Sequence, residues 1–205
     1  MDNQNGARQP FAPITPPSWG AMACKRAFDI VCSLLGLVVL SPLLLVVSLL
    51  VAATSPGGVF FRQERIGKGG KPFRIFKFRS MRKDNAGLKI TTGNDSRITP
   101  VGRFLRKSSL DELPQLINVV RGEMSLVGPR PIVEAEIAKY GEVYADYCRV
   151  RPGITGLWQV SGRNNTTYEE RVNLDRYYVT NWCIWMDLWI LARTFPVVLT
   201  GYGAY

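Results

Sequence analysis

The chain has 205 residues, of which 46% are hydrophobic and 20% charged, and its 26 Lys and Arg outweigh 16 Asp and Glu to give a formal charge of +10. This length accommodates one domain, with at most an appendage. The apolar fraction is too high for a disordered chain and the charge too abundant for a bundle of membrane spans. The composition therefore predicts a globular domain with a real core.

The residues that are missing limit the chemistry. The sequence contains no histidine, and its four cysteines are scattered without a C-x-x-C pair. This argues against zinc sites, histidine-based triads and a disulfide framework. Acid, base or nucleophilic chemistry must then come from carboxylates, Lys, Arg, Tyr or hydroxyl groups. A divalent cation, if used, would be an oxygen-liganded ion such as Mg²⁺.

The N-terminal region divides into a tail and an apolar segment. Residues 1–23 are rich in Pro, Gln, Asn and Ala, which predicts a flexible tail. Within residues 24–55, the stretch from Ile30 to Ala53 carries no charge and is long enough to be a membrane segment. Ser41 and Pro42 lie at its midpoint and predict a sharp bend. Basic residues flank both ends, so we expect a re-entrant hairpin with both ends on the cytoplasmic face; a single kinked span is the alternative.

The positive charge is concentrated in one part of the chain. Residues 62–107 hold fourteen Lys and Arg against three acidic residues, while the rest of the chain is nearly neutral. The partner should therefore be anionic, and beside a membrane segment, lipid headgroups or a nucleotide phosphate are better candidates than nucleic acid. Aromatic and basic residues alternate in 59–63 and 73–79 around a glycine-rich turn at 67–71. This pattern predicts a β-hairpin with one apolar and one cationic face.

Helical patterns dominate the remainder. We expect a loop over 83–100 and helices over 109–120, 132–148 and 167–179. Three of the five tryptophans fall within 182–193, which indicates a helix at the membrane surface or in the core. Residues 56–205 should thus form a compact, mostly helical α+β domain on the cytoplasmic side of the membrane.

Adjacent carboxylates form the first chemical candidate. Asp111 and Glu112 follow a basic stretch at the start of an expected helix and could supply a nucleophile and a metal ligand. The structural alternative is a capping box, because Ser109 precedes Glu112 by three residues and acids favour the first helical turn.

Three further motifs could bind phosphate or metal. Arg130 stands between two prolines in Gly128–Pro131, which suits bidentate phosphate binding or simply a rigid turn with a salt bridge. The glycine-rich stretch 151–164 resembles a loop that approaches a ligand closely, and it ends near Arg163. Asp175 could form an ion pair with Arg171 one turn earlier, or serve a metal or sugar.

Taken together, the motifs resemble those of the bacterial sugar transferase family, the monotopic phosphoglycosyl transferases. The resemblance covers residue 25 to about residue 205 and depends on several motifs in order: Lys25-Arg26-x-Phe28-Asp29, Ser41-Pro42, Lys77-Phe78-Arg79-Ser80-Met81, Leu110-Asp111-Glu112-Leu113-Pro114-Gln115, Gly128-Pro129-Arg130-Pro131, Arg151-Pro152-Gly153-Ile154-Thr155-Gly156 and Asp175-x-Tyr177-Tyr178.

The resemblance implies a two-step reaction at the bacterial cytoplasmic membrane. The family moves a sugar 1-phosphate from a UDP-sugar to undecaprenyl phosphate, releases UMP and begins the assembly of exopolysaccharide and related glycans. By similarity, Asp111 attacks the β-phosphate to form a phosphosugar-aspartate, and Glu112 holds Mg²⁺. Candidates to neutralise the diphosphate are Lys77, Arg106, Arg130 and Arg163. Asp175 would be a metal ligand or a carboxylate just outside the ligand shell.

The motif 156–163 and the tryptophan-rich end make the chain most similar to the hexose-1-phosphate transferases of exopolysaccharide synthesis, in a short form without additional N-terminal spans. UDP-galactose or UDP-glucose is therefore the favoured donor, and a homodimer is possible. Two other functions remain open: a non-catalytic adaptor that binds anionic lipid, and a glycosyltransferase that releases UDP. A membrane-tethered nucleic-acid binder is a weaker alternative, because the membrane segment beside the basic residues favours lipid headgroups or a nucleotide phosphate as the partner.

Overall fold

The computed structural model describes residues 18–55, 57–82, 95, 97–162 and 166–200. Its elements, in chain order, are α1 (Trp19–Val39), α2 (Ser41–Thr54), β1 (Phe60–Ile66), the 3-10 helix η1 (Lys68–Gly70), β2 (Pro72–Phe78), α3 (Pro100–Lys107), η2 (Leu110–Glu112), α4 (Gln115–Arg121), β3 (Ser125–Val127), η3 (Glu134–Glu136), α5 (Ile137–Tyr140), α6 (Val143–Tyr147), β4 (Gly153–Thr155), α7 (Leu157–Val160), α8 (Tyr168–Asn181) and α9 (Ile184–Thr200). The mostly helical α+β class is confirmed. Most of the predicted tail and most of the predicted 83–100 loop lie outside the described residues.

The apolar N-terminal segment is a bent pair of helices. α1 and α2 meet at Leu40 with an angle of 64° between them. Pro42 lies in the first turn of α2, where a missing N–H costs least, and the Ser41 hydroxyl donates to the Val38 carbonyl at 2.7 Å. No described helix has the length and apolarity of a membrane span by itself, whereas this pair reaches them together. The bend lies where the sequence predicted it.

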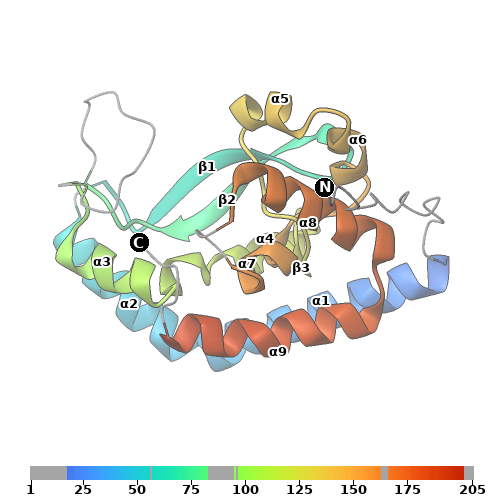
Figure 1. Cartoon of the computed structure of the whole chain (residues 1–205). Helices are drawn as coiled ribbons and strands as arrows, with labels where there is room; N and C mark the ends of the chain where they lie inside the picture. The colour runs from blue at the N-terminus through green and yellow to red at the C-terminus, as the bar shows by residue number, and fades with distance from the viewer. Residues whose placement is uncertain (1–17, 56, 83–94, 96, 163–165, 201–205) are drawn as a thin grey trace.

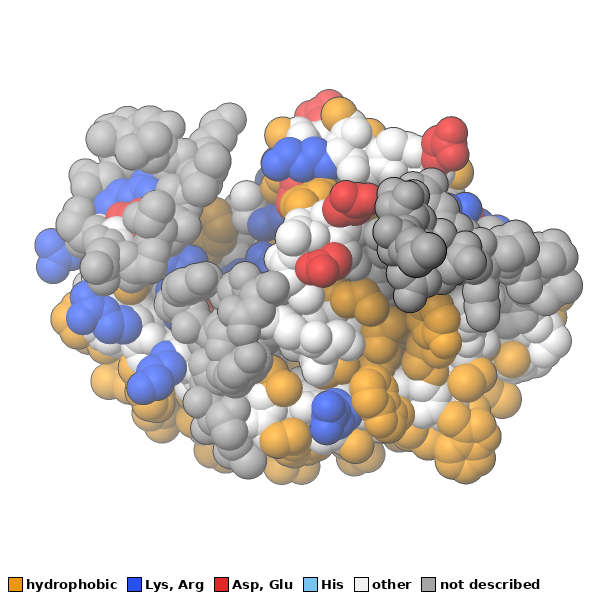
Figure 2. Space-filling view, viewed as in Figure 1, with side chains coloured by type: hydrophobic (Ala, Val, Ile, Leu, Met, Phe, Trp, Pro, Cys, Tyr) orange, Lys and Arg blue, Asp and Glu red, His pale blue; other side chains and the backbone are white. Residues whose placement is uncertain are grey.

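The bent pair and α9 expose apolar side chains. Trp185 of α9 is 74% exposed, and α1 and α2 leave many aliphatic side chains open to solvent, including Val38 and Leu49. α9 runs along the same side of the molecule as α1 and α2 (Figure 1), and hydrophobic side chains gather at this edge in Figure 2. Ile190 of α9 is nonetheless buried. One side of the tryptophan-rich helix thus packs in the core and the other is exposed, and its position at a membrane surface stays a prediction.

The predicted β-hairpin is present. β1 pairs with β2 in antiparallel register from Phe60 opposite Phe78 to Ile66 opposite Pro72. The expectation of one apolar and one cationic face is wrong. Alternation places Lys77 on the same face as Ile75, whereas Phe76 lies on the opposite face with Arg74. Two adjacent apolar residues break the strict alternation, so each face carries both apolar and basic side chains.

α4 packs against the edge of the hairpin and fixes its position. Asn118 of α4 accepts a hydrogen bond from the Phe76 amide at 2.9 Å and donates to the Arg74 carbonyl at 2.8 Å. The amide side chain thereby replaces a neighbouring strand along the β2 edge. Because η2 immediately precedes α4, this contact holds η2 beside the end of β2.

One of the three predicted helices forms as a continuous helix, and the other two are interrupted. α8 confirms the third, and Thr167 and Glu170 form a capping box at its start. The 132–148 helix is instead divided into η3, α5 and α6, with Gly141 at φ 50° and ψ −129° between the last two. The 109–120 helix is also interrupted, for reasons that concern the candidate site.

Candidate active site

A strained turn presents the adjacent carboxylates. α3 ends at Lys107, and Ser109 then adopts φ 56°, the only positive φ at a described residue other than glycine. Asp111 and Glu112 follow in η2, and Pro114 separates them from α4. The predicted capping box is wrong, because the left-handed Ser109 makes no side-chain cap bond. Such a backbone conformation costs about 1–2 kcal/mol for an L-residue and commonly marks a functional position.

The Asp111 carboxylate is buried but not isolated. Its residue is 8% exposed, and burial, followed by the neighbouring Glu112, raises the pKa of Asp111 to about 6, while Lys77 and Arg106 oppose this shift. At pH 7 the group is still mainly ionised, and it is more basic than an ordinary aspartate. A carboxylate of this kind is a better nucleophile than one fully stabilised by solvent.

Glu112 is held by a close ion pair. The Lys77 ammonium lies 2.5 Å from a Glu112 carboxylate oxygen, and both side chains are largely shielded from solvent. Lys77 is the next-to-last residue of β2, and the hairpin edge contacts η2. The fold therefore brings together two residues that lie 35 positions apart.

A narrow pocket opens beside this ion pair. Its lining includes two arginines and two amide side chains: Arg65, Arg130, Gln115 and Gln159. Arg65 donates to the Pro131 carbonyl at 3.0 Å, so it supports the turn that carries Arg130. The Arg130 guanidinium lies 5.7 Å from the Trp158 ring centroid. Of the predicted site residues, Lys77, Glu112 and Arg130 thus share one pocket.

Two buried polar atoms at this pocket have no protein partner among the described residues. The Nε atom of Arg65 and the Oε1 atom of Gln159 are buried without a hydrogen bond. Orphaned polar atoms of this kind are rare in folded proteins, and they indicate a site for a polar ligand. Sequence reasoning missed Arg65. The hairpin register would have revealed it, because paired residues place Arg65 and Lys77 on the same face.

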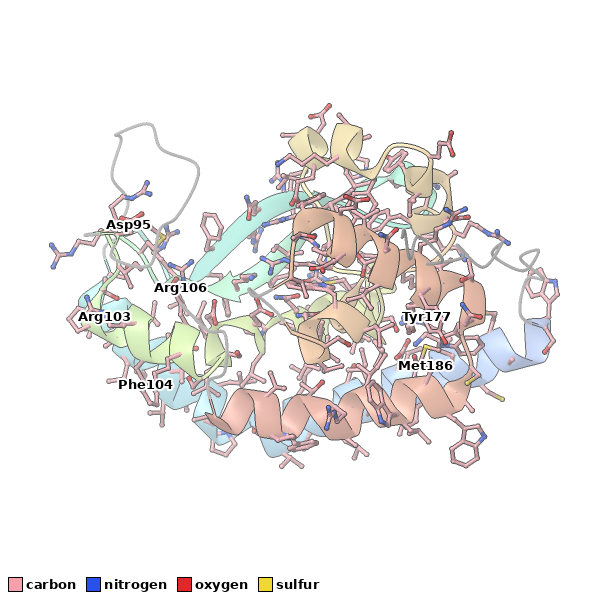
Figure 3. All side chains as sticks on the ribbon, viewed as in Figure 1. Asp95, Arg103, Phe104, Arg106, Tyr177 and Met186 are labelled. Carbon is pink, nitrogen blue, oxygen red and sulfur yellow. The ribbon has the colours of Figure 1, made fainter. Side chains whose placement is uncertain are left out.

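Arg106, another basic residue predicted for the site, does not line this pocket. Arg106 of α3 lowers the pKa of Asp111 and lies 3.9 Å from the Met81 sulfur. Figure 3 shows it at the end of the hairpin, while Phe104 points to the other side of α3. Arg163 lies outside the described residues.

Asp175 lies in the core rather than at this pocket. It is 2% exposed and accepts a hydrogen bond from the Tyr140 hydroxyl at 2.7 Å. The predicted ion pair with Arg171 is replaced, because Arg171 reaches Glu136 at 3.6 Å. Burial raises the pKa of Asp175 to about 7.

The adjacent carboxylates could supply only some of the ligands of a metal ion. Among the described residues, no group of three or more Asp, Glu or Cys could enclose a cation. Mg²⁺ commonly retains several waters and takes one or two carboxylates together with substrate phosphates. The adjacent Asp111 and Glu112 fit that requirement, and Glu112 lines the pocket, whereas the Tyr140-bonded Asp175 does not.

Comparisons with known proteins identify the family of the chain. The model of the bacterial sugar transferase family matches residues 20–201. An exopolysaccharide production protein ExoY of Sinorhizobium fredii is 44% identical, over 100% of this chain and 94% of that protein. An undecaprenyl-phosphate galactose phosphotransferase of Salmonella typhimurium is 46% identical over 88% of this chain. A UDP-glucose:undecaprenyl-phosphate glucose-1-phosphate transferase of Escherichia coli is 43% identical over the whole chain.

The chain spans 41% of the Salmonella protein and 46% of the Escherichia protein, so it corresponds to only part of each. The family match nevertheless covers nearly all described elements, from α1 to α9. The chain therefore belongs to the bacterial sugar transferase family and is a sugar-transferring enzyme.

Proposed function

We propose that this enzyme transfers hexose 1-phosphate from a UDP-hexose to undecaprenyl phosphate and releases UMP, as the first membrane step of exopolysaccharide assembly. The observation that carries the proposal is the buried Asp111, with a pKa of about 6, beside the Lys77–Glu112 ion pair. Galactose and glucose are the favoured sugars, since relatives are named for these two.

In the first step, a carboxylate oxygen of Asp111 attacks the β-phosphorus of the donor. A new bond forms between this oxygen and the phosphorus, and the bond from the phosphorus to the bridging oxygen breaks, so UMP leaves with that oxygen. The hexose phosphate is then held as an acyl phosphate on Asp111. The raised pKa supports this role because it makes the ionised carboxylate more basic.

In the second step, a phosphate oxygen of undecaprenyl phosphate attacks the same phosphorus and displaces the Asp111 carboxylate. The product is a lipid diphosphate sugar, and the carboxylate is regenerated. Both steps bring anions together, so nearby cations must neutralise the charge that builds on the phosphoryl oxygens. Lys77, Arg65 and Arg130 surround the pocket in which this charge would develop.

The pocket must open for the donor. Lys77 is already paired with Glu112 at 2.5 Å, so a diphosphate has to compete with Glu112 for the ammonium group. When bound, Mg²⁺ would supply charge neutralisation on the diphosphate, and Glu112, together with Asp111, would hold it. Releasing Glu112 from Lys77 would free both groups for these tasks.

The bent helices support a membrane position for the reaction. The α1–α2 pair bends by 64° and exposes apolar side chains, which suits a re-entrant hairpin with both ends on the cytoplasmic face. The phosphate of the lipid acceptor lies at headgroup level, where such a hairpin would carry the catalytic domain.

The test is nucleotide release in detergent, with Mg²⁺, undecaprenyl phosphate and a panel of UDP-sugars. Wild type should release UMP with one or two sugars, and Asp111→Asn should release none. Omitting the lipid should still yield a substoichiometric burst of UMP from wild type and a protein-bound radiolabelled sugar phosphate, because the first step needs no acceptor. Chelation by EDTA should stop the release.

Each alternative predicts a different nucleotide. Release of UDP would identify glycosyl transfer, and the absence of any nucleotide from every donor would favour the lipid-binding adaptor. A wild-type burst that persists in Asp111→Asn would exclude Asp111 as the nucleophile while leaving the overall reaction intact.

A further inference from the structure

A second cavity lies at the N-terminal end of α1. Its volume is about 290 Å³, and it shares no lining residue with the pocket beside Glu112. Aromatic and aliphatic side chains, including Trp19, Val127 and Trp182, form much of its wall. Five basic residues also line it: Lys25, Arg26, Lys68, Arg149 and Arg151. We refer to it as the α1 cavity.

The basic residues that line the α1 cavity outnumber the acidic residues that line it or pair with them. Lys25 pairs with the buried Asp187 at 2.5 Å, and Arg149 lies 3.8 Å from Asp146. Within the described part of the chain, Arg26, Lys68 and Arg151 form no ion pair. One acidic residue, Asp29, lines the cavity, and its carboxylate accepts bonds from Ser125 and the Leu126 amide. The cavity therefore carries a positive charge that its own acids do not balance.

The two arginines are held in place by backbone. Arg26 donates to the Val119 and Val120 carbonyls at 2.8 and 3.2 Å, and Arg151 donates to the Gly122 carbonyl at 2.8 Å. These carbonyls lie at and just beyond the C-terminal end of α4, where positive charge is favourable. The two guanidinium groups repel each other. A bound anion would relieve that repulsion, and it would meet side chains that have little freedom left to lose.

The apolar wall adds a second requirement for the ligand. Trp19 at the start of α1 is 94% exposed, and Met22 one turn later lines the cavity together with Val150 and Val179. Hydrophobic side chains also gather at this end of the molecule in Figure 2. An inorganic phosphate would satisfy the cations and leave the apolar wall uncovered. A phosphate attached to hydrocarbon chains would satisfy both.

We propose that the α1 cavity binds the phosphate of an anionic glycerophospholipid, between Lys68, Arg26 and Arg151, with the acyl chains against the apolar wall that includes Trp19 and Trp182. This lipid is not the reacting one. Asp111 and Glu112 precede the N-terminal end of α4, whereas the cavity adjoins its C-terminal end, about 9 Å further along the helix axis. The site therefore anchors the enzyme to anionic membrane independently of its reaction.

The test is lipid binding to the full chain in detergent, followed by native mass spectrometry. Phosphatidylglycerol should bind in preference to phosphatidylcholine, and Lys68→Gln/Arg151→Gln should weaken it about thirtyfold, roughly fivefold for each basic side chain removed. Because Arg151 also contacts Gly122, Lys68→Gln alone serves as a second variant, with an expected fivefold loss; Lys68 is exposed and its removal should leave folding intact.

The matched control is Lys71→Gln/Arg74→Gln, which removes two positive charges from the same hairpin but outside the cavity. It should change phosphatidylglycerol affinity less than twofold. An equal loss in the control would overturn the site, as would unchanged binding in both cavity variants. Displacement of the lipid by an equal concentration of inorganic phosphate would overturn a lipid ligand in favour of a free anion. UMP release in detergent by Lys68→Gln should equal that of wild type.

Discussion

Asp111 and Asp175 are both buried carboxylates whose pKa burial raises, to about 6 and about 7, yet their surroundings differ. Asp111 lies in a strained turn beside Glu112, with Lys77 and Arg106 acting on its charge. Asp175 lies within the regular helix α8 and accepts the Tyr140 hydroxyl. A raised pKa alone thus does not identify a reactive group. Cations do not do so either, because Arg171 and Arg130 act on Asp175. What distinguishes Asp111 is the adjoining pocket with its Lys77–Glu112 ion pair.

The largest expected difference between the two carboxylates appears when each is replaced by asparagine. Asp111→Asn should lower UMP release by roughly 10⁴-fold, the scale expected for loss of a nucleophile. Asp175→Asn should stay within about threefold of wild type, because the amide oxygen can still accept the Tyr140 hydroxyl. Loss of activity in a folded Asp175→Asn variant would contradict the assignment of Asp175 to the core.

Thermal unfolding of the same two variants gives an independent readout. A carboxyl group whose folded pKa exceeds its unfolded value of about 3.8 reduces stability as the pH rises from about 4 through the folded pKa. Both neutral variants should therefore melt higher than wild type at pH 8, by about 5 °C for a gain of about 2 kcal/mol. At pH 4 the difference should nearly vanish, since the native carboxyls are then protonated.

A smaller loss is expected from the arginine between the two prolines. Arg130→Lys should reduce kcat/KM by 10²–10³-fold, because an ammonium group cannot bind phosphate in the bidentate manner of a guanidinium group. Arg121→Lys is the matched control: Arg121 packs over Phe76 at 4.9 Å and does not line the pocket. Steady-state kinetics with varied donor would measure both. Equal losses in the two variants would show that the effect is not local to the pocket.

The sequence predicted what depends on residue type and local pattern. The hairpin, the bend near Ser41, α8 and the adjacent carboxylates were all visible as local signals. It could not predict the interruption at Ser109, because no local preference requires a serine to take φ 56°. The turn at Ser109 instead follows the contacts that η2 makes with α3 and with β2.

Contacts between segments that lie far apart in the sequence could not be predicted either. The Lys77–Glu112 ion pair and the bond from Arg65 to Pro131 depend on how the hairpin docks on α4, which Asn118 fixes. At Asp175 the residue type allowed a metal or sugar role, whereas the fold buries the carboxylate in α8 and supplies the Tyr140 hydroxyl of α5 as its partner. Residue type indicates possible chemistry, and burial decides which of the possibilities is available.

The pH dependence of kcat/KM should also distinguish the two carboxylates, through a change of about tenfold per pH unit. With a pKa of about 6, Asp111 should lose its ionised form below pH 6, so kcat/KM should fall about tenfold for each further unit. The measurement is nucleotide release between pH 4.5 and 8 in wild type and in Asp175→Asn. The two profiles should coincide, because Asp175 is buried and does not line the pocket. A profile that stays flat down to about pH 4.5 would mean that Asp111 has an ordinary pKa in the working enzyme.

The smallest expected effect concerns the turn that sets Asp111 apart from Asp175. Ser109→Gly should stabilise the folded protein by about 0.5–1 kcal/mol, since glycine adopts φ 56° without strain but gains more freedom on unfolding. Ser108→Gly is the control; Ser108 is right-handed and its hydroxyl donates to Phe104, so this variant should be less stable. The freer turn should also let Asp111 leave its reactive position, and activity should fall about threefold. Gain of stability with full activity would show that the strain only reflects how η2 packs against α3 and β2.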